Sequence, residues 1–167
     1  MPIKDPKQLF VWMLSDVRQG AERSTQIFEE LAQVAQDPDV KEALEARVFV
    51  NSTVLSTLDE CFKRIGQKPV NTKGRLHEVL VEDFRRELAE IESKEGRRLF
   101  ILAKASRLAH IRMAEYEALI AMADFTGNYG VAVLLESCLA DKMALAERTR
   151  HLIRHRMEER VATAIGS

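Results

Sequence analysis

Histidine and aspartate side chains are the groups in this sequence that could bind a metal, and the candidates are few. His151 and His155 are four residues apart, the spacing at which one face of a helix offers two imidazole nitrogens to zinc. Leu152 follows the first histidine, where the His-Glu-x-x-His motif of zinc enzymes has its glutamate. We therefore interpret this pair as solvated residues of a polar helix.

His110 and Asp141 are two further candidates for a metal ligand or a proton carrier. His110 lies in a largely apolar stretch, where a lone histidine is usually a hydrogen-bonded residue of the core or its boundary. Asp141 shares a helical face with Cys138 and Leu145, and carboxylates are seldom buried without a partner. Asp141 is therefore either the remnant of a site or a buried polar contact, and both interpretations stay open at this point.

The charge and the cysteines argue against several classes of protein. The formal net charge is −1, which gives the chain no overall attraction to nucleic acid. The stretch from Arg148 to Arg156 is basic, but Glu147 precedes it and no Phe, Tyr or Trp is interleaved. No apolar run approaches the roughly 20 residues that span a bilayer. Cys61 and Cys138 form no Cys-x-x-Cys pair, and we interpret them as buried, reduced thiols of a cytoplasmic protein, with a single disulfide as the alternative.

Segments with helical periodicity must position these residues. The chain has 167 residues, 46% of them hydrophobic, with 7 Gly and 4 Pro, which indicates one all-α domain over residues 1–167 with its core at about 6–163. Apolar residues recur at spacings of three and four over the ranges 6–36, 40–65, 76–93, 97–126 and 131–163. The loop 67–74 and the segment 76–93 form one long connection. The pattern predicts an antiparallel four-helix bundle with an extra helix in the crossover between the second and third core helices.

Several short stretches occur in the order found in a known family. They are Leu9-Phe10, Leu14-Ser15-Asp16, Glu30-Leu31-Ala32, Phe62 followed by Gly66-Gln67-Lys68-Pro69, and His110 followed by Ala114-Glu115-Tyr116. In these stretches the chain resembles the YciE/YciF-like branch of the ferritin-like superfamily, which are small bacterial stress-associated proteins. The resemblance covers about residues 9–152, and it implies a ferritin-like bundle that forms a homodimer.

The resemblance also implies a di-metal site, which this sequence does not keep. Such a site needs about four carboxylates and two histidines that point into the bundle. In an ungapped comparison the ligand positions of the family fall on Ala21, Phe49, Ser52 and Ala109. His110 and Asp141 remain as residual polar candidates, and residues 46–57 contain no carboxylate and no histidine. We therefore predict no metal site, no catalytic residue and no cofactor.

Three functions are compatible with these observations. The first is a non-catalytic, metal-free ferritin-like protein with a stress-associated or structural role, acting as a homodimer. The second is an iron-handling or di-metal oxidase-like protein with a rearranged site around His110 and Asp141. The third is a stress protein that contacts nucleic acid through its basic last helix. The replaced ligand positions favour the first function.

Overall fold

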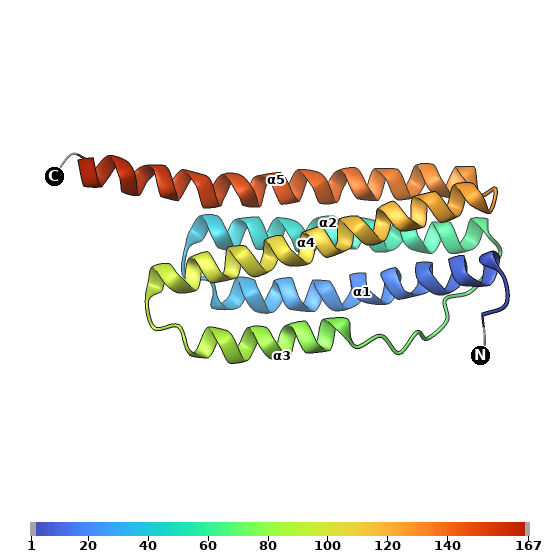
Figure 1. The fold of residues 1–167 in the computed structure, drawn as a ribbon, viewed down its shortest axis with the longest axis horizontal. Coiled ribbons are helices and arrows are strands. Elements are labelled where there is room, and N and C mark those ends of the chain that lie inside the picture. Colours follow the sequence, from blue (N-terminus) through green and yellow to red (C-terminus); the bar gives the residue numbers. More distant parts are fainter. Residues whose placement is uncertain (1–2, 166–167) are drawn as a thin grey trace.

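The computed structural model describes the main chain of residues 3–165, with the side chains of residues 3–76 and 78–155. Within this range the chain forms five helices, α1 Pro6–Val34, α2 Pro38–Arg64, α3 Leu76–Ala89, α4 Lys94–Phe125 and α5 Tyr129–Ile165. In Figure 1, α1, α2, α4 and α5 lie lengthwise as a bundle, and α3 runs along its outer side next to α1. The predicted four-helix bundle with a crossover helix is therefore confirmed.

Polar caps and glycines set the ends of these helices. Asp5 starts α1 by accepting a hydrogen bond of 2.8 Å from the N–H of Gln8, and Asp37 caps α2 in a similar way. Gly66 and Gly127 follow α2 and α4 with φ of 64° and 76°, a backbone conformation that favours glycine. The observed ends lie within three residues of the predicted ones, except that α3 ends at Ala89. After Ala89 the chain tightens, because the N–H groups of Glu90 and Ile91 donate to the carbonyl oxygens of Glu87 and Leu88 three residues earlier. The Ser93 hydroxyl then caps α4.

Two apolar clusters fill the bundle, one towards each end. The first contains Phe10, Leu14, Val54, Leu58, Tyr116 and Leu135, from all four long helices. The second contains Phe28, Leu31, Leu44, Ile101, Leu102 and Leu108, together with Phe84 and Leu88 from α3. Along α1, α2 and α4, the residues between the two clusters include buried polar side chains. The core is therefore apolar at both ends and polar in its middle.

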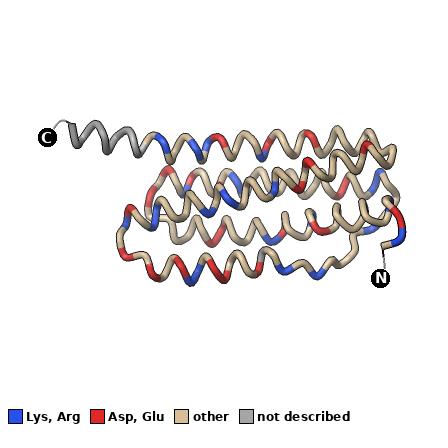
Figure 2. The backbone as a smooth tube through the Cα atoms, viewed as in Figure 1, with Lys and Arg blue, Asp and Glu red and all other residues tan. Residues whose placement is uncertain are grey.

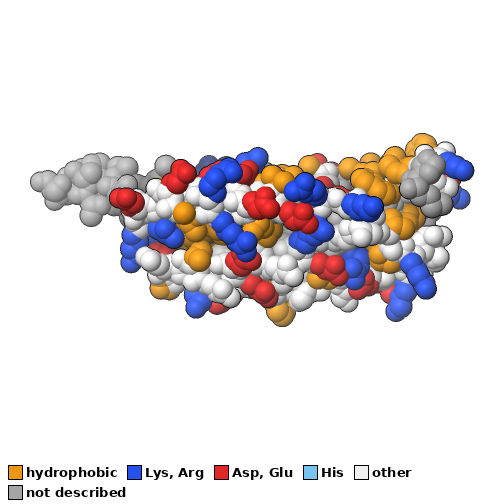
Figure 3. Space-filling model, turned by 90° about the horizontal axis from the view of Figure 1, so that it is seen from below, with side chains coloured by type: hydrophobic (Ala, Val, Ile, Leu, Met, Phe, Trp, Pro, Cys, Tyr) orange, Lys and Arg blue, Asp and Glu red, His pale blue; other side chains and the backbone are white. Residues whose placement is uncertain are grey.

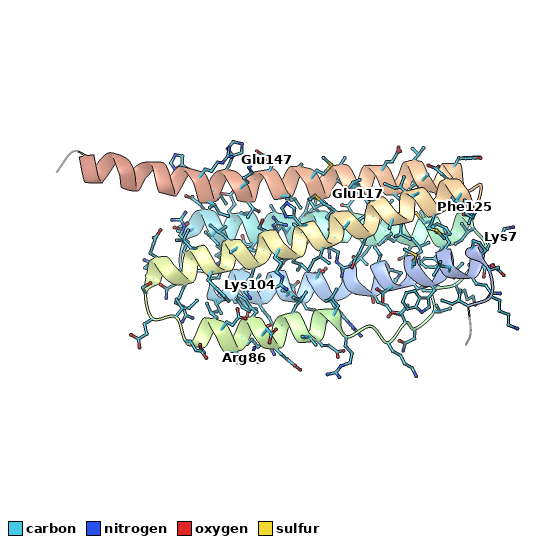
Figure 4. All side chains as sticks on the ribbon, in the orientation of Figure 1. Lys7, Arg86, Lys104, Glu117, Phe125 and Glu147 are labelled. Atoms are coloured by element: carbon cyan, nitrogen blue, oxygen red, sulfur yellow. The ribbon has the colours of Figure 1, made fainter. Side chains whose placement is uncertain are left out.

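The crossover helix α3 is held by both packing and ion pairs. Phe84 stacks on Phe100 of α4 with ring centroids 5.6 Å apart. Arg85 pairs with Glu30 of α1 at 2.7 Å, and Lys104 of α4 pairs with Glu87 of α3. Figure 4 shows Lys104 between these two helices. This helix covers the second cluster on the side of α1 and α4.

The surface carries mixed charge. Acidic and basic residues are interspersed along the helices in Figure 2. Figure 3 shows the same mixture on the face that includes α3, with hydrophobic side chains gathered at the end near the N-terminus. Ile3, Trp12 and Val70 are partly exposed at that end and line one pocket. Among the described residues, no helix is both long and apolar enough to cross a membrane.

Candidate functional site

A layer of buried polar side chains crosses the middle of the bundle, where the resemblance implies a di-metal site. We call these residues the central polar layer; they are Ser24, Arg47, Asn51, Arg112, Lys142 and Thr149, and each is at most 6% exposed. Every long helix contributes to the layer. Charged side chains are rarely buried to this extent unless they are paired or hydrogen-bonded. Their partners therefore determine what the layer can do.

Asn51 links α5 to α1 through the centre of the layer. The ammonium group of Lys142 donates a hydrogen bond of 2.7 Å to Oδ1 of Asn51. The amide nitrogen of Asn51 donates to the carbonyl oxygen of Ala21 at 2.5 Å and to the hydroxyl of Thr25 at 2.8 Å. An amide suits this position because it offers an acceptor to one helix and two donors to another. At this contact the positive charge of Lys142 therefore faces the dipole of the Asn51 amide and not a carboxylate.

Arg47 joins α2 to α5 on one side of this link. Its guanidinium group donates to the carbonyl oxygen of Leu145 at 3.0 Å and to the hydroxyl of Thr149. It also lies 5.4 Å from the ring centroid of Phe28, within the range of a cation–π contact. Burial lowers the pKa of Arg47 to about 10, so this side chain stays charged at neutral pH.

Arg112 lies on the other side of the layer, directly against the backbone of α1. A Cβ atom at Gly20 would lie 1.9 Å from Nη2 of Arg112, which explains a glycine in the middle of α1. Arg112 forms an ion pair of 2.5 Å with Glu115, one turn along α4. Burial raises the pKa of Glu115, and the neighbouring Arg112 opposes that rise. The layer thus contains three cationic side chains and pairs one of them with this carboxylate.

Lys142 binds its proton less tightly than an ordinary lysine. Burial lowers the pKa of Lys142 to about 8, and the charges of Arg112 and Arg47 add to this effect. A region with this excess of positive charge disfavours any further cation by Coulomb repulsion, which is strong in an interior of low dielectric constant. The three cationic side chains of the layer offer hydrogen-bond donors, which recognise oxygen acceptors and do not coordinate metal ions.

The lowered pKa of Lys142 predicts a dependence of stability on pH. The folded-state pKa of about 8 lies below the ordinary value of 10.5, so the unfolded chain binds more protons between these pH values. The free energy of unfolding should therefore rise with pH across this window, by about 2 kcal/mol between pH 8 and 10. Urea titrations of wild type and Lys142→Met at both pH values test this. The free energy of unfolding of Lys142→Met should not rise between pH 8 and 10. An equal rise in the free energy of unfolding for both proteins would contradict the assignment to Lys142.

Comparison with known proteins shows where this bundle belongs. Residues 5–162 match the family described as a domain of unknown function, DUF892. The chain belongs to this family. It is 22% identical over 145 residues to protein YciF of Escherichia coli (strain K12), which covers 86% of this chain and 87% of the relative. The predicted resemblance to YciE/YciF-like proteins is therefore confirmed.

Two solved structures share the fold of this DUF892 protein. The crystal structure of the E. coli stress protein YciF matches with a TM-score of 0.87 at 22% identity, over 93% of this chain and 99% of that one. YcfI, a candidate structural protein from Rhodopseudomonas palustris, matches with a TM-score of 0.85 at 23% identity, over 89% and 94% of the two chains. At this level of identity the likeness shows the fold alone.

The structure corrects two of the four positions to which the lost ligands were assigned. Ala21 and Ala109 are 2% and 3% exposed and face the interior, as expected. Phe49 is 74% exposed and Ser52 is exposed, so the prediction that they face the interior is wrong. On α2 the inward positions are those of Arg47 and Asn51. An ungapped comparison is therefore out of register on α2, where Phe49 and Ser52 follow the inward residues Arg47 and Asn51 by two residues and one residue.

The two residual polar candidates are also on the outside. His110 is exposed, and its Nδ1 lies 2.8 Å from the carbonyl oxygen of Ser106 one turn earlier. Asp141 is exposed as well, because its neighbour Lys142 takes the inward position on α5. The interpretations of His110 as a core or boundary residue and of Asp141 as a buried contact are therefore wrong. Among the described side chains, no three His, Cys, Asp or Glu residues are grouped so that they could hold a metal.

The remaining chemical candidates have simple roles. His151 is exposed, 3.5 Å from Glu147, and His155 is exposed on the same helix, as expected for solvated residues. Cys61 and Cys138 are free and buried, as predicted. Burial raises the pKa of these thiols to about 12 and about 11, so neither is a thiolate at neutral pH.

Proposed function

We propose that this chain is a metal-free, ferritin-like member of the DUF892 family that acts by association and not by catalysis. The observation that carries the proposal is the central polar layer, in which Arg47, Arg112 and Lys142 lie between the two apolar clusters. The proposal includes a single domain, a homodimer and a cytoplasmic location. A role in stress or in structure is supported by two relatives, one called a stress protein and the other a candidate structural protein.

The chemistry of the layer supports the absence of a di-metal centre. Two divalent cations add four positive charges, which carboxylate ligands must neutralise. Here α2 contributes Arg47 and Asn51 to the interior, and α5 contributes Lys142. A protonated amine or guanidinium group has no lone pair to donate to a metal. The side chains that occupy the space thus repel the metal and already hold the helices together.

Metal analysis of the purified protein tests this proposal. The chain should be expressed in cells supplied with iron and manganese, purified without chelators and analysed by mass spectrometry for bound metal. We expect well below one equivalent of any transition metal per chain, and the same value for His110→Ala. Two equivalents per chain would contradict the proposal. A single equivalent lost in His110→Ala would instead favour a rearranged site at His110.

A further inference from the structure

A pocket of about 640 Å³ opens at the end of the bundle that carries the N-terminus. It lies between the start of α1, the end of α2, the loop that follows α2 and the turn between α4 and α5. Hydrophobic side chains gather at this end of the molecule in Figure 3. Binding sites for small molecules usually have volumes of about 300–1,000 Å³. This pocket, which we call the end pocket, is therefore large enough for a small organic ligand.

The walls of the end pocket are mainly apolar. They are formed by Ile3, Phe10, Val11, Trp12, Ile65 and Val70. Ile3, Trp12 and Val70 are 44%, 38% and 43% exposed, although each is a large hydrophobic residue. Apolar surface that is left in contact with water favours binding of an apolar group, because binding removes that surface from water. The walls therefore suit a hydrocarbon chain.

Hydrogen bonds to the main chain of the loop hold one wall of the end pocket in place. The side-chain amide of Gln19 donates to the carbonyl oxygen of Val70 at 2.7 Å, and the N–H of Val70 donates to the hydroxyl of Ser15 at 3.0 Å. The hydroxyl of Thr72 donates to the carboxylate of Asp16 at 2.6 Å. None of these bonds uses the Val70 side chain. A substitution at Val70 should therefore change the wall without releasing the loop from α1.

The polar side chains of the end pocket favour an anionic head group. They belong to Lys7, Gln8, Gln67, Asn71, Thr126 and Asn128, so Lys7 is the one charged residue among the described residues that line the pocket. Lys7 is exposed and lies at the same end of the bundle as Phe125 in Figure 4. Its ammonium group attracts a carboxylate and repels a cation. The nearby Asp5 does not line the pocket, and its carboxylate accepts a hydrogen bond from the N–H of Gln8.

We propose that the end pocket binds a fatty acid, with the hydrocarbon chain against Trp12 and Val70 and the carboxylate at Lys7. A fatty acid combines the two properties that the pocket selects, an apolar chain and a single negative charge at one end. This inference goes beyond the proposed function, and it depends neither on the homodimer nor on the absence of a metal.

The fluorescence of Trp12 measures this binding directly, because the chain contains one tryptophan and that residue lies in the pocket wall. Dodecanoate, titrated as the monomer, should change the fluorescence saturably, with a dissociation constant on the order of 10 µM. Dodecanol, which has the same chain and no charge, should bind about tenfold more weakly, and dodecyltrimethylammonium should bind more weakly still. Absence of saturable binding, or equal affinity for the anionic and cationic amphiphiles, would overturn the proposal. So would a response to phosphatidylglycerol vesicles without a response to dodecanoate, since this would indicate a membrane-docking surface.

Two substitutions separate the charge of the end pocket from its apolar wall. Lys7→Glu should raise the dissociation constant of dodecanoate about tenfold or more and leave that of dodecanol within about twofold of wild type. Val70→Glu should weaken the binding of both compounds, because it places a carboxylate in the apolar wall.

Each substitution has a matched control elsewhere in the chain. Lys41→Glu makes the same change of charge near the start of α2, at the other end of that helix. Val79→Glu alters a valine of α3 that is 43% exposed, the same fraction as Val70. Both controls should bind dodecanoate as wild type does, and circular dichroism should show all four variants folded. Unchanged binding by Lys7→Glu and Val70→Glu would overturn the proposal, as would equal losses in the controls. If a pocket variant fails to fold, the comparison of the three amphiphiles with wild type still decides the question.

Discussion

Replacing Asn51 by leucine should destabilise this protein by about 3 kcal/mol, because the substitution leaves a buried charge without its partner. Asn51 accepts the hydrogen bond of Lys142, which is 6% exposed, and donates to Ala21 and Thr25 of α1. Leucine is similar in size, so packing changes little. The loss should appear as a lower urea midpoint with an unchanged slope.

The double variant Asn51→Leu with Lys142→Met separates the charge from the packing. Lys142→Met alone should cost about 1–3 kcal/mol, since it leaves Oδ1 of Asn51 buried without its donor. Replacing both partners removes the charge and its acceptor together, and the double variant should recover most of the loss. Additive losses would mean that Asn51 and Lys142 act independently and that the link between α1 and α5 is of little importance.

The second large effect is expected at Asp37, which has two tasks at the start of α2. Its carboxylate accepts hydrogen bonds from the N–H groups of Asp39 and Val40, and it pairs with Arg98 of α4 at 2.5 Å. The Arg98 side chain is only 7% exposed. Asp37→Ala should therefore cost about 1 kcal/mol for the cap and about 3 kcal/mol for the buried guanidinium group.

Two further substitutions show which task dominates. Asp37→Asn keeps a capping oxygen but removes the charge, so it should be about 1 kcal/mol less destabilising than Asp37→Ala. Asp5→Ala removes the corresponding cap of α1, which is exposed, and should cost only about 1 kcal/mol. Equal losses for Asp5→Ala and Asp37→Ala, measured by urea unfolding, would show that the pair with Arg98 contributes nothing.

The helices could be predicted from the sequence because periodicity and capping are local properties. The apolar stripe of α1, with Phe10, Leu14 and Val17, is buried as its spacing indicates. The capping residues Asp5 and Asp37 lie next to prolines in the sequence, which makes the starts of α1 and α2 visible. The contacts between the helices depend on which face each helix turns towards the core. A short apolar pattern defines that rotation less well than it defines the helix itself.

The central polar layer is not evident from hydrophobic periodicity, because polar residues usually face water. A signal was nevertheless present on α2, where Leu44, Arg47, Asn51, Val54 and Leu58 follow one another at spacings of three and four, and all five are buried. Lys142 likewise follows the buried Cys138 by four residues, a spacing that places both on the same face of α5. Gly20 in the middle of α1 was a second signal, since it marks the close approach of Arg112.

Crystals grown with manganese and examined by anomalous diffraction provide the most direct test of the central claim, that protonated side chains occupy the place of a metal site. We predict no anomalous peak among α1, α2, α4 and α5 at the central polar layer, and a Lys142 ammonium within hydrogen-bond distance of Oδ1 of Asn51. One or two anomalous peaks in that layer, with carboxylates turned towards them, would contradict the account.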